Sequence, residues 1–181
     1  MNQDIALSNV VRNCTLCKLH TERIGNAEPA RLGSKYTEGG LAIWSDLPLS
    51  TRDTNFLSGL LQQAGIDKDS VLWLSRLRCR PPRNRIQDYP DAEVACDEWS
   101  KKEIEAYNPS VLVLAGNVAM RGVFGVQANI TSVRGAVRAT GSQYAYGNRI
   151  FCPTFHPSAA LRNPELSQTI VDDLRLAKEL L

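Results

Sequence analysis

The sequence lacks the features that mark membrane and secreted proteins. Its 181 residues contain no run of about eighteen apolar residues, which excludes a transmembrane helix. The first residues show no basic segment followed by an apolar one, so we expect no signal peptide and a cytoplasmic location. An odd number of cysteines, five, argues against a disulfide framework. Internal repeats and low-complexity segments are also missing, which excludes a repeat architecture.

The composition is that of an ordinary globular chain, with 43% hydrophobic and 22% charged residues. A formal net charge of +2 does not by itself indicate a nucleic-acid partner. The length suits one domain with a core of its own, so residues 1–181 are predicted to form a single domain.

Four short apolar stretches have the pattern of strands buried on both faces. They are residues 39–45, 70–74, 110–116 and 149–155. Helical spacing of apolar residues occurs at 55–64, 91–107 and 167–181. This alternation predicts an α/β fold with a mostly parallel sheet, and residues 125–148 are expected to form a hairpin or irregular insertion.

The stretch RLRCRPPRNR, residues 76–85, combines five arginines with Cys79 and with Pro81-Pro82. A packed core would reject so much charge, so the stretch is expected at the surface. Acidic residues follow in the predicted helix at 91–107. The alternatives are a phosphate-binding loop and a solvated loop with surface ion pairs.

The other cysteines suggest a metal centre. Cys14 and Cys17 form a C-x-x-C pair, while Cys79 and Cys96 are separate single residues. Zinc sites more often use two tight pairs, so a pair with two single thiolates favours an iron–sulfur cluster. Zinc and independent thiols remain alternatives on spacing alone, and Cys152, in an apolar stretch, is expected to be buried.

Several motifs together resemble the family 4, iron–sulfur, uracil-DNA glycosylases. They are C-x-x-C near the start, CRPPRNR at 79–85, Cys96, NPSVLVLAGNVA at 108–119, RG at 134–135 and PTFHPSAALR at 153–162. The resemblance runs from about residue 14 to residue 175. It implies a three-layer αβα domain with a central four-stranded parallel sheet. It also implies a [4Fe–4S] cluster on Cys14, Cys17, Cys79 and Cys96, and DNA bound at the carboxyl ends of the strands.

The resemblance assigns roles to the residues near the carboxyl end of the chain. His156 matches the family's histidine that donates a hydrogen bond to the departing base, although a histidine without this motif would more often be structural. Ser158 is expected to hold a DNA phosphate, Leu161 to wedge into the emptied base stack, and Arg162 to contact the backbone. Arg80, Arg83 and Arg85 are expected on the same DNA surface.

The sequence departs from the family where uracil is recognised. Asp46 and Pro48 stand in the first motif, but Ser45 and Leu49 replace its glycines. Asp46 is predicted to orient water or stabilise the sugar cation, with a helix or turn cap as the alternative. The aromatic segment that stacks on uracil is shortened or lost.

Two further positions bear on the base pocket. Phe56 could replace the lost aromatic, although its helical spacing indicates the core. Ser75 stands where the family has its uracil-reading asparagine, and a serine cannot make the paired amide contact.

The sequence therefore supports two functions of different classes, beside a third, a cluster-bearing enzyme of nucleic-acid modification that keeps the base site for different chemistry. The first is a DNA glycosylase that removes uracil or another non-standard base in base-excision repair. The second is an inactive iron–sulfur DNA-binding module, or an accessory subunit that docks a replication or repair protein on the same scaffold.

Overall fold

The computed structural model describes residues 2–125, 127–135, 138–140 and 146–181. The helices are α1 (Asn2–Arg12), α2 (Leu19–Glu22), α3 (Thr51–Gln63), α4 (Pro90–Tyr107), α5 (Asn117–Phe124), α6 (Ile130–Val133), α7 (Pro157–Arg162) and α8 (Leu166–Glu179). The strands are β1 (Arg31–Leu32), β2 (Leu41–Ser45), β3 (Leu72–Ser75), β4 (Val111–Ala115), β5 (Arg138–Thr140) and β6 (Arg149–Thr154). Within these described ranges no helix is both long and apolar enough to cross a membrane.

The strands form one sheet in the order β1-β3-β2-β4-β6-β5. The four inner strands run parallel, which confirms the predicted α/β class and its central four-stranded parallel sheet. The edge strands β1 and β5 pair antiparallel and were not expected, because each is short and lacks a continuous apolar run. β5 lies in the stretch predicted as a hairpin or insertion, and residues 126, 136–137 and 141–145 of that stretch fall outside the described ranges.

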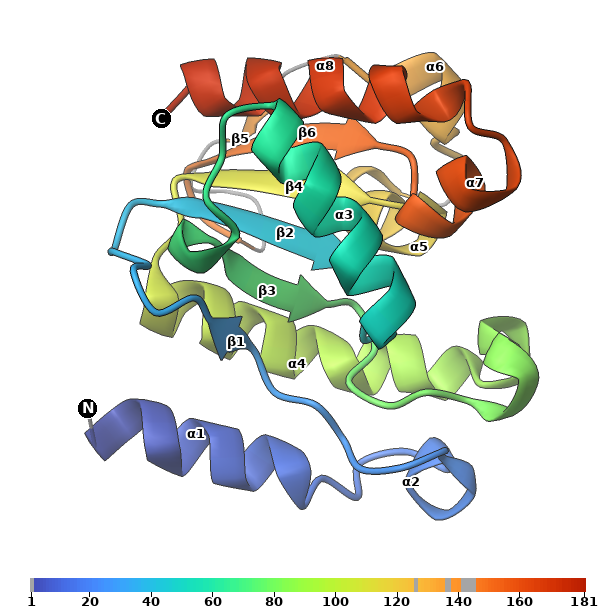
Figure 1. Cartoon of the computed structure of the whole chain (residues 1–181). Coiled ribbons are helices and arrows are strands. Elements are labelled where there is room, and N and C mark those ends of the chain that lie inside the picture. The colour runs from blue at the N-terminus through green and yellow to red at the C-terminus, as the bar shows by residue number, and fades with distance from the viewer. Residues whose placement is uncertain (1, 126, 136–137, 141–145) are drawn as a thin grey trace.

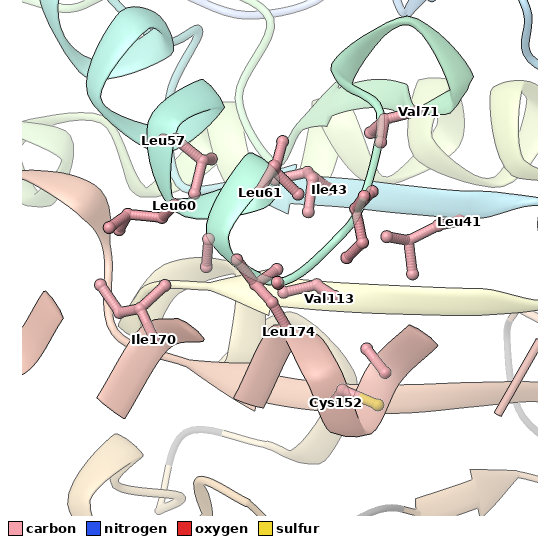
Figure 2. Packing of buried hydrophobic residues seen from close by; sticks show 14 of the residues in the cluster. Leu41, Ile43, Leu57, Leu60, Leu61, Val71, Val113, Cys152, Ile170 and Leu174 are labelled. Atoms are coloured by element: carbon pink, nitrogen blue, oxygen red, sulfur yellow. The ribbon is translucent and has the colours of Figure 1, made fainter. Parts of the chain in front are cut away.

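Helices cover both faces of the sheet, as the three-layer prediction requires (Figure 1). Alternate strand residues serve the two faces. Ile43 of β2 packs in a core with Leu57 and Leu61 of α3 and Leu174 of α8 (Figure 2). The next residue, Trp44, packs on the opposite face with residues of α4 and α5. Both faces of β2 are therefore buried, which explains its unbroken apolar sequence.

Two of the five clustered arginines are buried, so the expectation that the whole stretch lies at the surface is wrong. Arg78 is 1% exposed and pairs with Glu103 of α4, which is fully buried. Glu103 also accepts the Ala30 N–H at 2.7 Å. Arg76 pairs with Asp97, again from α4. The acidic helix thus provides counter-ions that make buried arginine tolerable.

Replacing Glu103 with Gln should lower the free energy of unfolding by about 3–5 kcal/mol, because it leaves Arg78 buried without a negative partner. Urea unfolding measures the change. Glu98→Gln in the same helix is the control, since Glu98 pairs with Lys102 in solvent and its loss should cost at most ~0.5 kcal/mol. Equal losses in both variants would contradict the assigned role of the buried pair.

Candidate functional site

A cavity of about 360 Å³ opens where the parallel strands end. The carboxyl ends of β2, β4 and β6 lie side by side in the sheet, so the residues that follow them converge (Figure 1). Asp46 follows β2, Gly116 follows β4 and His156 follows β6, and all three line the cavity. Asp53 of α3 and Arg80 complete its charged lining with Arg162.

Asp46, directly after β2, lies against the beginning of α5. Its Oδ1 accepts the Ala119 N–H at 2.9 Å. Burial is the main cause that raises the pKa of Asp46 to about 6, and the α5 backbone N–H groups oppose it. A Cβ on Gly116 would lie 2.5 Å from this carboxylate, and its φ of 122° also suits only glycine. Asp46 therefore caps the first turn of α5, which was one of the two predicted alternatives, and it also lines the cavity.

His156 is held by the turn that begins α7. Its Nδ1 accepts the Ser158 N–H at 3.1 Å, and Ser158 Oγ lies 2.8 Å from the same nitrogen. The neutral ring must then carry its proton on Nε2. Burial is the main cause that lowers the pKa of His156; Arg162 and Arg80 lower it further, and Asp53 raises it. At neutral pH the ring is thus a neutral N–H donor, and Ser158, expected on a phosphate, orients it.

The predicted base-pocket residues do not all meet in this cavity. Ser45, Pro48 and Ser75 line a neighbouring cavity of about 480 Å³, and only Pro48 also borders the first one. Ser45 Oγ contacts the Leu47 carbonyl oxygen at 2.7 Å, which commits it to the backbone. Phe56 lines neither cavity and packs against the core, as its helical spacing indicated.

Of the remaining arginines in this stretch, Arg80 is half-buried, whereas Arg83 and Arg85 are exposed. Arg80 is half-buried in the first cavity, where it donates to the Pro48 carbonyl and, at 2.8 Å, to Asn84 Oδ1. Arg83 is exposed in a left-handed conformation with φ of 56°. Arg85 is exposed and pairs with Asp88 at 3.0 Å.

The last two predicted DNA contacts lie in α7. Arg162 is exposed while lining the first cavity, and Leu161 beside it is half-buried. Their helix begins directly after His156, but of the two only Arg162 lines the cavity.

The four predicted ligand cysteines come together from three parts of the chain. Cys14 and Cys17 lie between α1 and α2, Cys79 follows β3, and Cys96 lies in α4. Burial is the main cause that raises the pKa of Cys96 to about 11, and the negative charges of Cys79 and Cys17 raise it further. Cys79 and Cys17 therefore lie within electrostatic range of Cys96, and Cys14 lies within range of Cys17 and Cys79.

The surroundings of these sulfurs suit thiolates. Trp99 Nε1 donates to Cys14 Sγ at 3.2 Å, Arg23 donates to Cys79 Sγ at 3.6 Å, and the Arg78 N–H donates to Cys96 Sγ at 3.5 Å. Across the described ranges no three His, Cys, Asp or Glu side chains lie close enough to hold a single metal ion.

Sequence reasoning assigned no role to Asp53, Arg23 or Trp99. Asp53 was detectable as the last residue of a capping box, Ser50-x-x-Asp53, in which Ser50 Oγ accepts the Asp53 N–H at 3.1 Å. Neither Arg23 nor Trp99 carries such a local signal, because their partners lie 56 and 85 residues away.

The chain is similar to proteins of one superfamily. The family model described as the uracil DNA glycosylase superfamily matches residues 33–175. A type-4 uracil-DNA glycosylase from Thermotoga maritima is 32% identical over 184 residues, which cover 97% of this chain and 93% of that protein. Another from Sulfurisphaera tokodaii is 28% identical, covering 94% and 81%. A DNA polymerase from Bacillus phage SP01 is 30% identical over 122 residues, which are 67% of this chain and 12% of the polymerase.

Proposed function

The chain belongs to the uracil DNA glycosylase superfamily, and we propose that it hydrolyses the N-glycosidic bond of uracil or another non-standard base in DNA. One observation carries this proposal. Asp46 and His156, from the ends of two different strands, line the same cavity with complementary chemistry. One is a buried acid, and the other is a neutral donor with its proton on Nε2.

The chemistry follows from these two groups. A target nucleotide flipped from the stack enters the cavity. As the bond between sugar carbon and base nitrogen breaks, its electrons leave with the base, and His156 Nε2–H stabilises the charge that grows on a base oxygen. Ionised Asp46 stabilises the sugar cation and orients water. The water oxygen bonds to the sugar carbon, and its proton neutralises the departing base.

We further propose that Cys14, Cys17, Cys79 and Cys96 hold a [4Fe–4S] cluster. The N–H groups directed at three of the sulfurs support this, because they stabilise thiolates. The cluster supplies a cross-link between the chain's N-terminal segment, the loop after β3 and α4. Arg80 follows Cys79 directly, so the cross-link also fixes a cavity residue.

Excision of a base is the direct test. Oligonucleotides carrying uracil and other modified bases are incubated with the protein and then treated with alkali, which cleaves at abasic sites. His156→Ala should lower excision about 10²–10³-fold because it removes the donor to the departing base. A protein that binds these DNAs tightly and excises nothing would instead support the DNA-binding module.

Arg83→Gln should weaken DNA binding equally for all sequences and reduce the slope of log affinity against log salt by about 0.9 for one lost phosphate contact. Fluorescence anisotropy over a salt series measures this slope. Lys68→Gln is the matched control, since Lys68 is exposed and precedes the amino end of β3, whereas Arg83 follows its carboxyl end. The same slope for Arg83→Gln and the native protein would remove this loop from the DNA surface.

A further inference from the structure

Position 75 carries no amide that could read the edge of a base. Two charged residues, Asp53 and Arg80, line the cavity of Asp46 and His156 and could take over this reading. Ser75 lines the neighbouring cavity and not the one that holds Asp46 and His156. Asp53 and Arg80, in contrast, line the cavity that contains both. Their charges act on the His156 ring in opposite directions, Asp53 raising its pKa and Arg80 lowering it, so both lie close to it.

Asp53 lies there because the connection after β2 is short. Residues 46–50 alone separate Ser45, the last residue of β2, from Thr51, the first residue of α3. Ser50 Oγ donates to Asp53 Oδ2 at 2.7 Å and accepts the Asp53 N–H. In the described part of the chain Oδ1 makes no hydrogen bond, so it is available as an acceptor.

Arg80 is fixed in the same cavity before any ligand binds. One terminal nitrogen donates to the Pro48 carbonyl and the other to Asn84 Oδ1, so two of its five N–H groups hold it in place. The remaining N–H groups are donors for a ligand. A guanidinium held in this way loses little conformational entropy when it binds.

We propose that Asp53 and Arg80 together read the base, with the carboxylate accepting a ring N–H and the guanidinium donating to the adjacent carbonyl oxygen. This deepens the proposed function and rests on it. With His156 Nε2–H on a second carbonyl, the three groups complement the sequence carbonyl, ring N–H, carbonyl. Uracil has that edge, and keto-purines such as hypoxanthine share its first two elements. Cytosine and adenine have no ring N–H on this edge, and their ring nitrogen would face the carboxylate.

The two side chains thereby perform the two halves of an amide's function. An asparagine offers one acceptor and one donor from a single residue. Here the acceptor comes from α3 and the donor from the loop after β3. The positive charge of Arg80 also offsets the negative charge of Asp53, which by itself would oppose the charge that develops on the departing base.

The test pairs a protein variant with a matched substrate. 3-Methyluracil in DNA keeps both carbonyls of uracil and replaces the ring N–H by a methyl group. The native protein should excise uracil at least about 100-fold faster than 3-methyluracil, because a buried acceptor without its donor is costly. Asp53→Ala should slow uracil excision about 100-fold and bring the two rates within about threefold of each other.

The ratio of the two rates separates base reading from a structural role. A variant that only loosens α3 slows both substrates equally and keeps the native ratio, which would overturn the proposal. Asp53→Asn keeps the helix cap while removing the charge; its ratio should fall about tenfold because a neutral amide oxygen accepts the ring N–H more weakly than a carboxylate does. An unchanged ratio in this variant would also contradict the proposal.

A binding measurement distinguishes this inference from the proposed function. Duplexes with 2′-fluorinated deoxyuridine or its 3-methyl derivative resist cleavage, so their affinities report recognition without chemistry. A preference of about tenfold or more for the unmethylated base, lost in Asp53→Ala, supports base reading even if excision is absent. If the protein excises uracil but does not bind the unmethylated base more tightly, base reading by Asp53 and Arg80 is contradicted and the proposed glycosylase function stands.

Discussion

Asp46→Asn should reduce excision by at least about 10²-fold and at the same time make the folded protein more stable at neutral pH. The first effect follows from the loss of the negative charge that stabilises the sugar cation. The second follows from the burial that raises the pKa of Asp46 from 3.8 to about 6 in the folded protein. Asparagine keeps the Oδ1 acceptor for Ala119 without carrying a buried charge.

The sign of the pH dependence is fixed by the raised pKa. Between about pH 4 and pH 6 the folded protein binds more protons at this site than the unfolded chain, so stability falls as the pH rises through that window. The full cost of ionising Asp46 is ~3 kcal/mol above pH 6. The variant should therefore be about 1–3 kcal/mol more stable at pH 7.5 and equal to the native protein near pH 4.

Urea unfolding at several pH values, together with the rate of excision, measures both effects. Excision by the native protein should fall below about pH 6 as Asp46 becomes protonated. Asp172→Asn is a control, because Asp172 is exposed on α8 and away from the cavity. A variant that loses activity without any pH-dependent gain in stability would show that Asp46 is not ionised in a buried setting.

Cys96→Ser should remove the visible colour of the cluster and lower the free energy of unfolding by at least about 4 kcal/mol, as loss of a structural metal site does. Cys96 is buried and its partners come from the N-terminal segment and from the loop after β3. Figure 1 shows α1 and α2 beside α4, outside the layers that cover the sheet. Without the cross-link, this N-terminal segment should also become the first site of proteolysis.

The control for this variant is Cys152→Ala. Cys152 is also buried, but it packs in the core against β4 and α8 and has no other cysteine near it. It should lose about 1 kcal/mol while the iron content and visible absorbance stay unchanged. Iron analysis, absorbance and urea unfolding of the two variants decide the assignment. Full colour in Cys96→Ser, or equal losses in both, would contradict a cluster held by the four cysteines.

Apolar periodicity and short motifs, both local properties of the sequence, determined the class of fold. The central strands β2 and β4 are continuous apolar runs because each is buried on two faces, and such a run is visible without any knowledge of its neighbours. The edge strands β1 and β5 depend on pairing with a distant strand, so their short sequences gave no signal. Asp46 and His156 were expected near strand ends because each follows a stretch predicted as a strand, and both line the same cavity.

Only the tertiary structure decided which charged groups are buried and which cavity each polar residue faces. RLRCRPPRNR is one uniform basic stretch in the sequence, yet it divides into Arg76 and Arg78 beside the acidic face of α4, Arg80 in the cavity, and exposed Arg83 and Arg85. That division depends on counter-ions from α4, on α3 lying close to β2, and on the loop's left-handed turn. These are long-range contacts, and no local pattern encodes the electrostatic environment that they create.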